Sequence, residues 1–292
     1  MRLDVNLYRV QQKGFCFYNS MRNFPETINR YKFESFGVKI GIESNSERFL
    51  KKIIENLQNI IPSKYFVEIT SETIHNFFIE KQKKVLRLYK NGEVITSGEN
   101  EENFFNYFFS RLRLTVAEFA SEKVFLHAGV VGWQGKTIII PGASYSGKTT
   151  LVAELIKRGA DYFSDEYAVL DENGETHPFP KTLSVRGIID KYKQVEFPAE
   201  TFNAKIATHP VPVGMILLLQ YEKGATWNPQ ILSPGNGILE ILSHTVPIRF
   251  NPKFSLQVLN NITNRAIIAK SKRGEAKEVV NLLLKFFEAK AI

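Results

Sequence analysis

Residues 142–150 read Gly-Ala-Ser-Tyr-Ser-Gly-Lys-Thr-Thr, which matches the phosphate-binding pattern G-x-x-x-x-G-K-[ST] in full. The preceding residues, 136–141, form a β-branched apolar run of strand length. The following residues, 151–158, have the apolar spacing of a helix with a cationic last turn, and Gly159 stands where a helix stop is expected. The pattern requires this order of strand, loop and helix, so the sequence predicts a nucleotide-binding loop in an α/β domain.

Each residue type in this loop has its own chemical purpose. The glycines let backbone N–H groups converge on phosphate oxygens, and the helix that begins near Gly147 points its positive dipole end at the same anion. Lys148 is expected to reach the β- and γ-phosphates, and Thr149 to offer its hydroxyl to Mg²⁺. We therefore predict ATP and Mg²⁺ as cofactors, with the nucleotide held by Gly142, Ala143, Ser144, Tyr145, Ser146, Gly147, Lys148, Thr149 and Thr150.

Composition excludes several other classes of protein. The chain has 292 residues with 43% apolar content, enough for one large domain or two ordinary ones. Its single cysteine, Cys16, excludes an internal disulfide, and no N-terminal apolar run resembles a signal peptide, so a cytoplasmic location is expected. The apolar run at 213–219 is too short to span a bilayer and predicts a buried strand rather than a membrane protein. The formal charge of +8 favours anionic partners, but the basic residues are dispersed, so nucleic-acid binding is not predicted.

The residues before the loop predict a small α+β unit. Alternation at 36–42 indicates a strand, residues 46–57 indicate an amphipathic helix with Ser46 as its N-cap, and Asn91-Gly92 indicates a tight hairpin. Further strands are expected around 66–70, 76–79, 85–89 and 93–96. Residues 101–121 predict a long helix whose aromatic stripe is typical of a core or a subunit contact. We place the boundary at the end of this helix, which gives domains 1–120 and 121–292 and leaves a homo-oligomer possible.

The residues around and after the loop alternate between strand and helix patterns. Strands are expected at 124–131, at 161–170 with two carboxylates interrupting it, at 182–186, at 213–219 and at 266–270. Helices are expected at 233–244, 254–262 and 275–289. Residues 188–212 show no clear period and predict an irregular surface segment that helps to read the substrate.

A phosphate loop alone does not say which group receives the phosphate. Asp165 and Glu166 follow the loop's helix at strand-length distance, where an acidic residue commonly holds Mg²⁺ or accepts a proton from a substrate hydroxyl. The alternative is that Asp165 caps a turn and Glu166 lies in solvent. His127, on the strand before the loop, is either a proton carrier or a satisfied core histidine.

Arg186 can neutralise charge on a transferring phosphate, or can instead pair with Asp190 at the surface. The other histidines show no metal-ligand spacing with one another; they are His75, His177, His209 and His244.

With these residues in view, positions 124–292 resemble the catalytic domain of bacterial HPr kinase/phosphorylase and its HPr-kinase-like relatives. The matching pieces are Leu126-His-Ala-Gly-Val-Val131, the loop, Glu154-Leu-Ile-Lys-Arg-Gly159, Asp165-Glu166 and Leu183-Ser-Val-Arg-Gly187. The resemblance implies the α/β fold shared with phosphoenolpyruvate carboxykinases, a P-loop on a mixed, twisted sheet, and hexamers in the authentic enzymes. It also implies that His127 lies in the active site, that Asp165 is the base for a serine hydroxyl, and that Arg186 lies near the phosphates.

The chain departs from the family's pattern in three places. Glu166 stands where the family tends to have a second aspartate, and Ser184 stands where it has a metal-binding glutamate. A hydroxyl binds Mg²⁺ less well than a carboxylate, so either Glu166 takes over as ligand or only one metal is held. Residues 1–121 do not resemble the family's regulatory domain. These departures disfavour HPr as substrate and favour the branch whose members resemble kinases of ribosomally made peptides.

We therefore predict an ATP- and Mg²⁺-dependent kinase that phosphorylates a hydroxyl, namely a serine of a protein or of a ribosomally made peptide. In this hypothesis Asp165, His127 and Arg186 are catalytic, while Thr149 and Glu166 bind the metal. The alternative from another class is a nucleotide-binding regulator or scaffold of the same fold that has lost transfer, with other NTPases and small-molecule kinases also left open. The sequence does not identify the acceptor or tell whether phosphorolysis accompanies transfer.

Overall fold

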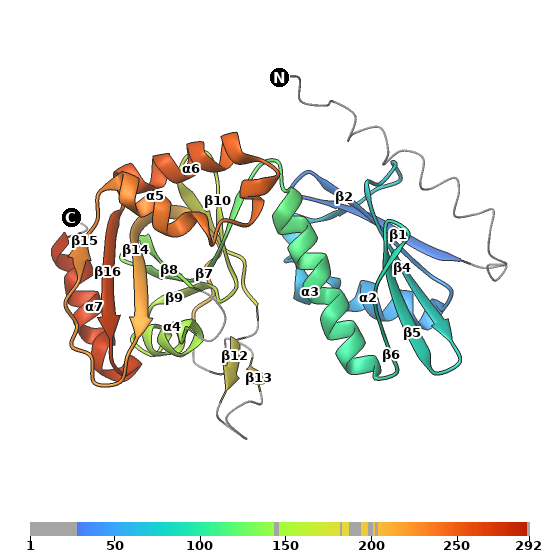
Figure 1. Ribbon diagram of the computed structural model, residues 1–292, viewed down its shortest axis with the longest axis horizontal. Coiled ribbons are helices and arrows are strands. Elements are labelled where there is room, and N and C mark those ends of the chain that lie inside the picture. The colour runs from blue at the N-terminus through green and yellow to red at the C-terminus, as the bar shows by residue number, and fades with distance from the viewer. Residues whose placement is uncertain are drawn as a thin grey trace, which may run out of the picture. The chain divides into compact units, whose positions relative to one another are not determined.

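The computed structural model describes residues 28–142, 146–181, 183–186, 194–197, 201 and 204–290, with the backbone alone described for 183–186 and 194–197. The chain divides into two compact units, Met1–Val116 and Ala117–Ile292, and each is described by itself (Figure 1). That the chain forms two domains, divided after residue 120, stays a prediction.

The described part of the first unit is a six-stranded mixed sheet with the helices α2 and α3. The strand order is β3-β1-β2-β4-β5-β6, and only β2 and β4 pair in parallel. Rings of α3 meet rings of α2 and β4 edge-on, with Phe105 at 5.3 Å from Phe49 and Phe108 at 5.6 Å from Phe77. The predicted aromatic stripe thus forms core. The bounds are β1 (Asn29–Ser35), β2 (Val38–Ser44), α2 (Glu47–Ile60), η3 (Ser63–Tyr65), β3 (Val67–Glu68), β4 (His75–Gln82), β5 (Val85–Lys90), β6 (Glu93–Gly98) and α3 (Glu101–Phe119).

Local details of this unit differ from the sequence prediction in two places. The strand predicted at 36–42 was wrong at its start, because Phe36 and Gly37 have φ values of 50° and 79° and form the turn from β1 to β2. The strand predicted at 66–70 is reduced to Val67–Glu68. Ser46 does occupy the N-cap of α2 but its side chain makes no capping hydrogen bond. The hairpin at Asn91-Gly92 is confirmed, with positive φ at both residues as its turn requires.

The second unit is also built on a mixed sheet, with strand order β11-β10-β7-β8-β14-β16-β15 and β9 beside β7. Strand β14 pairs in parallel with both β8 and β16, and the other pairs are antiparallel. Strands β12 and β13 form a separate two-stranded ribbon. The strands are β7 (Val124–Trp133), β8 (Lys136–Pro141), β9 (Asp161–Ser164), β10 (Tyr167–Leu170), β11 (Glu175–His177), β12 (Leu183–Arg186), β13 (Gln194–Phe197), β14 (Val211–Tyr221), β15 (Gln230–Ile231) and β16 (Ile267–Arg273).

The helices of this unit cover both faces of its sheet. Alternate residues of β8 point to opposite sides, so Ile138 and Ile140 pack with α4 and α7, whereas Ile139 packs with α5 and α6. The helices are α4 (Lys148–Ile156), α5 (Pro234–Leu242), η5 (Val246–Arg249), α6 (Pro252–Arg265) and α7 (Ala276–Lys290). The predicted helices and the buried strand at 213–219 are thus confirmed, while much of the segment 188–212 lies outside the described residues. Within the described part of the chain, no helix is long and apolar enough to cross a membrane.

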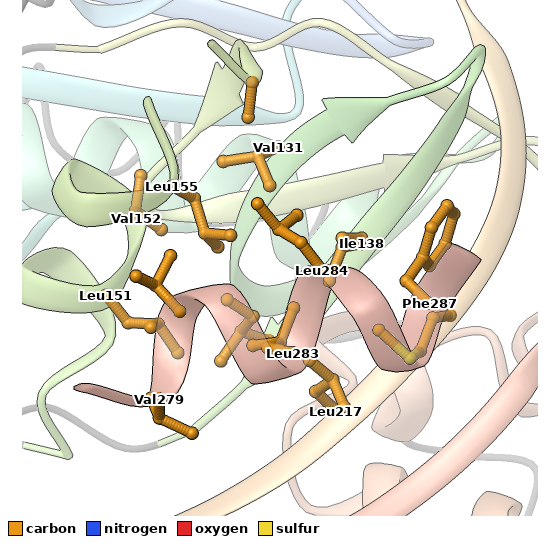
Figure 2. Close-up of a cluster of buried hydrophobic side chains, with 14 of the residues drawn as sticks. Val131, Ile138, Leu151, Val152, Leu155, Leu217, Val279, Leu283, Leu284 and Phe287 are labelled. Carbon is orange, nitrogen blue, oxygen red and sulfur yellow. The ribbon is translucent and has the colours of Figure 1, made fainter. Parts of the chain in front are cut away.

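The core between α4 and α7 holds the loop's helix against the sheet. Figure 2 shows side chains of α7, including Leu283 and Leu284, gathered with side chains of α4 and of the sheet. Leu283 is fully buried, and its neighbour Leu282 is 50% exposed. Because α7 is amphipathic, Leu283 faces the core and stabilises the fold by its burial, whereas Leu282 faces solvent.

We expect Leu283→Ala to lower the free energy of unfolding by about 2–5 kcal/mol, because truncation of a buried leucine loses its transfer energy and leaves a cavity. Leu282→Ala, the matched change on the exposed side of the same helix, is expected to cost less than about 1 kcal/mol. Urea denaturation of the full chain measures both. Equal losses in the two variants would contradict this packing of α7.

Candidate functional site

The predicted phosphate loop leaves the sheet at the end of β8 and enters α4. Gly142 follows the last residue of β8, and Gly147 is the N-cap of α4 in the left-handed conformation, with φ 82° and ψ 16°. A φ of 82° is a conformation that L side chains rarely adopt, so glycine is favoured at 147, and a Cβ there would also contact the end of the Arg273 side chain. Ala143, Ser144 and Tyr145 of the predicted set lie outside the described residues.

Lys148 turns back over the loop. Its Nζ donates to the Gly142 carbonyl at 2.6 Å, and the residue is only 8% exposed. Burial lowers the pKa of Lys148, while the charges of Asp165 and Glu166 act to raise it. The ammonium group therefore lies where the loop begins, with two carboxylates within electrostatic range.

Asp165 lies at a bend between β9 and β10, two strands that both pair antiparallel with β7. Ser164 pairs with Val130 and Tyr167 with His127, so the two acidic residues occupy the positions between these pairs. The Ser164 hydroxyl accepts from the backbone N–H groups of Glu166 and Tyr167 at 3.2 and 3.1 Å, which fixes the bend. The interruption predicted within 161–170 is thus a turn that presents carboxylates to the loop.

The Asp165 carboxylate is bound to the first turn of α4. The Thr149 hydroxyl donates to its Oδ2 at 2.8 Å. Its Oδ1 is buried and has no hydrogen-bond partner within the described part of the chain. Burial raises the pKa of Asp165 to about 6, against the opposing effects of the Thr149 hydrogen bond and the Lys148 charge. A buried acceptor oxygen beside a phosphate-loop threonine is an arrangement that a cation or a substrate proton would complete.

Gly129 makes room for this contact from the neighbouring strand. A Cβ there would lie 2.6 Å from Val152 of α4 and 3.7 Å from Asp165 Oδ1. The lack of a side chain at this position of β7 therefore lets α4 approach the sheet closely enough for Thr149 to reach Asp165.

Glu166 has a different partner. Its Oε2 lies 3.1 Å from Lys181 Nζ, and both side chains are 17% exposed. Sequence reasoning placed Glu166 among the metal ligands and did not identify Lys181. The pair leaves Asp165 as the carboxylate that contacts the loop's threonine.

Two histidines lie within electrostatic range of Lys148, namely His127 and His244. The His127 backbone N–H donates to the His244 carbonyl at 2.8 Å, which ties β7 to the segment after α5. Burial and the Lys148 charge lower the pKa of His127 to about 4, against the effect of Glu166, and the same two causes lower the pKa of His244. His127 is therefore neutral near pH 7. His244 was not identified from the sequence, because only the fold brings it beside the loop.

Arg186 lies at the end of β12, opposite Gln194 of β13. Its side chain and that of Ser184 are outside the described part of the structure. The predicted contact between Arg186 and phosphate, and the consequence of Ser184 for metal binding, stay predictions.

A cavity of about 600 Å³ opens beside Gly142 and Ser146. Its wall includes the ends of the parallel strands β14 and β16, together with Leu218, Leu219 and His244. Lys270 in this wall is paired with Glu240 at 2.6 Å, and Lys272 with Glu222 at 2.7 Å. The remaining polar residues of the lining are neutral, namely Gln220, Thr226, Asn228, Gln230 and Ser271.

The site offers oxygen ligands rather than a protein-built metal cage. Among the described residues no group of three or more histidines, cysteines or carboxylates could hold a metal ion. Mg²⁺ does not need such a group, because it usually takes one or two protein oxygens and completes its shell with phosphate oxygens and water. The Thr149 hydroxyl and the Asp165 Oδ1 atom, which has no hydrogen-bond partner among the described residues, are oxygen ligands of this kind. These residues therefore fit a nucleotide-bound Mg²⁺.

Among known proteins, the chain is similar to a solved structure at low sequence identity. No protein-family model matches the chain, and no curated protein matches it. A solved structure of the Hpr(Ser) kinase/phosphatase from Coxiella burnetii matches 57% of this chain and 97% of its own, with 16% sequence identity and a TM-score of 0.31. At that identity and TM-score the match does not decide the fold or the activity of this chain.

The buried Asp165 carboxylate gives stability a defined pH dependence. As pH falls through about 6 the folded chain takes up a proton at Asp165, whereas the unfolded chain, with a pKa near 3.8, does so only later. The free energy of unfolding therefore increases as pH falls from about 6 towards 3.8. Above about pH 6 the carboxylate is ionised in the folded chain, and its full destabilising effect is present. We expect Asp165→Asn to be more stable than wild type at pH 7.5, by on the order of 2–3 kcal/mol, and this difference to shrink by about 1 kcal/mol at pH 5.

Urea denaturation at the two pH values, with a chelator present to remove divalent cations, measures this difference. Asp161→Asn, which changes a more exposed carboxylate of β9, is the matched control. A stability difference for Asp165→Asn that is the same at both pH values would contradict a raised pKa for this carboxyl group.

Proposed function

We propose that the chain is an ATP- and Mg²⁺-dependent kinase that transfers the γ-phosphoryl group to a hydroxyl, the serine of a protein or of a ribosomally made peptide. The observation that carries this proposal is the contact between the Thr149 hydroxyl and the buried Asp165 carboxylate, next to Lys148. This contact brings a residue of the predicted phosphate loop beside a carboxylate. Phosphoryl transfer needs a group that holds the phosphates and an acidic residue that binds the metal or orients the nucleophile. In this proposal the second unit is a P-loop domain of the HPr kinase and phosphoenolpyruvate carboxykinase type. A cytoplasmic location, where ATP is available, is part of the proposal.

The loop and Lys148 hold the triphosphate in this proposal. Lys148 exchanges its bond to the Gly142 carbonyl for phosphate oxygens, and the backbone N–H groups at the start of α4 face the same anion. Thr149 and Glu166 would hold Mg²⁺, which when bound neutralises charge on the β- and γ-phosphates. Glu166 would take part only after release from Lys181, since the two are paired at 3.1 Å.

Asp165 is the proposed base. The substrate hydroxyl oxygen forms a bond to the γ-phosphorus, the bond from that phosphorus to the bridging oxygen breaks, and the hydroxyl proton passes to Asp165. A pKa of about 6 keeps this carboxyl group ionised at neutral pH and makes it a stronger base than an exposed aspartate. The Thr149 hydrogen bond occupies Oδ2 and orients Oδ1 for the proton. His127, neutral at this pH, lines the site, and Arg186 is proposed to stabilise charge on the phosphoryl group.

The nucleoside is assigned to the cavity beside Gly142. Its volume of about 600 Å³ is within the range of small-molecule sites, and it adjoins the loop on the side of β14. Neutral amides and hydroxyls in its lining provide hydrogen-bond donors and acceptors for a base and a ribose.

The second candidate is a nucleotide-binding regulator or scaffold that transfers nothing. Two observations favour it: Ser184 stands where a metal-binding carboxylate is expected, and Glu166 is bound to Lys181. Such a protein would bind ATP and leave it intact with every substrate.

Transfer is tested by incubating the full chain with γ-labelled ATP, Mg²⁺ and serine-containing peptides, with label on the peptide as the readout. We expect Lys148→Ala to lose nucleotide binding and transfer together. Asp165→Asn should still bind ATP but lose transfer at least about 100-fold, as expected for removal of a general base. Lys157→Ala, a more exposed lysine just after α4, is the matched control and should keep both activities.

The outcomes of this experiment separate the candidates. Transfer that survives in Asp165→Asn rules out Asp165 as the base. ATP binding without consumption, for wild type and for all peptides, favours the regulator.

Binding of ATP is expected to be at least about tenfold tighter than binding of inorganic tripolyphosphate, because only ATP fills the cavity. Isothermal titration calorimetry of wild type with each compound, at one Mg²⁺ concentration, measures the two dissociation constants. Equal constants would show that the cavity does not hold the nucleoside.

A further inference from the structure

We propose that Arg273 is a positioning residue that fixes the end of the phosphate loop before nucleotide binds. The inference rests on the proposed nucleotide binding by residues 142–150. Arg273 is the last residue of β16, a strand separated from β8 in the sheet by β14 alone. No sequence pattern singles it out, since it lies more than a hundred residues beyond the loop.

The guanidinium of Arg273 is buried and bound to backbone carbonyls. The residue is 3% exposed, and its Nη2 donates to the Gly147 carbonyl at 3.1 Å. Its Nη1 donates to the Gly274 carbonyl at 2.9 Å, and the guanidinium lies 5.4 Å from the centre of the Tyr221 ring. Burial of a cation is costly, so a guanidinium held in this way among the described residues indicates a specific role at the carbonyl it contacts.

The Gly147 carbonyl matters because it fixes the peptide unit that opens α4. The same oxygen also accepts the first hydrogen bond of the helix, from Leu151 N–H at 3.2 Å. In a trans peptide the C=O and the following N–H point in opposite directions. By holding the carbonyl, Arg273 therefore directs the Lys148 N–H to the opposite side. That N–H belongs to the first turn of α4, where donors have no partner in the helix and are available to an anion.

Gly147 leaves space beside the end of the Arg273 side chain. A Cβ on residue 147 would meet Arg273 Nη2, so a larger residue there would shift the guanidinium from its present contact with the carbonyl. Gly147 has a φ of 82°, in the left-handed region that glycine adopts without strain, and in this conformation its carbonyl accepts from Arg273. The simpler role for Arg273 is to tie β16 to α4, and that role predicts a loss of stability without a loss of phosphate binding.

The two roles are separated by measuring ligand affinity and stability in the same variants. Arg273→Met removes the donors and the charge with similar length, and Arg273→Lys keeps the charge but cannot bond to both carbonyls in the geometry of a guanidinium. Calorimetry of the full chain with ATP and with inorganic tripolyphosphate, both with Mg²⁺, gives dissociation constants, and thermal unfolding without ligand gives Tm. We expect Arg273→Met to weaken both ligands at least about tenfold, and Arg273→Lys to weaken both at least about threefold.

Arg158→Met is the matched control, because Arg158 ties the residues after α4 to α7. Its Nε donates to Asn281 at 2.9 Å and its Nη1 to Glu154 at 3.2 Å. This change is expected to lower Tm and to leave both dissociation constants within about twofold of wild type. Dissociation constants within twofold of wild type in either folded Arg273 variant overturn the inference. Failure of wild type itself to bind either compound would instead overturn the proposed nucleotide binding on which it rests.

Discussion

The hydrogen bond from the Thr149 hydroxyl to Asp165 Oδ2 joins the two halves of the candidate site. One partner lies in the first turn of α4, and the other lies at the bend between β9 and β10. Their approach depends on Gly129, since a Cβ there would lie 2.6 Å from Val152 and would force α4 away from β7. The packing of α4 between the sheet and α7 thus sets the distance between a phosphate-loop residue and the proposed base.

The charges around this bond are arranged so that one carboxylate remains reactive. Glu166 is paired with Lys181 at 3.1 Å, and Lys148 donates to the Gly142 carbonyl. Among the described residues the hydrogen-bond donor to the Asp165 carboxylate is the neutral Thr149 hydroxyl, and burial raises the pKa of Asp165 to about 6. If Asp165 were paired with a lysine as Glu166 is, the pair would hold it ionised with a low pKa and make it a weak base. The different partners of two adjacent residues therefore give them different chemistry.

The sequence predicted those helices and strands whose formation depends on residues close together in the chain. The strand and the helix predicted within residues 136–158 are found as β8 and α4, because β-branched residues and helical spacing act within a few positions. The single strand predicted at 161–170 is instead two strands, β9 and β10, and the two carboxylates that interrupt the apolar run lie at the bend between them. By contrast, Lys181, His244 and Arg273 reach the site through sheet order and through turns distant in sequence, and no local pattern encodes those contacts. The turn at Phe36 was missed because a phenylalanine with φ of 50° breaks the rule that favours glycine or asparagine there.

The end of the loop is held from three directions at successive residues. Arg273 of β16 binds the Gly147 carbonyl, Lys148 binds the Gly142 carbonyl within the loop, and Asp165 binds the Thr149 hydroxyl. Two of these bonds come from elements outside the loop, and neither needs to break for phosphate to approach the helix N-terminus. Only the bond of Lys148 competes with the ligand. In the proposed binding of an anion, residues 147–149 therefore lose less conformational entropy, and more of the contact energy remains as affinity.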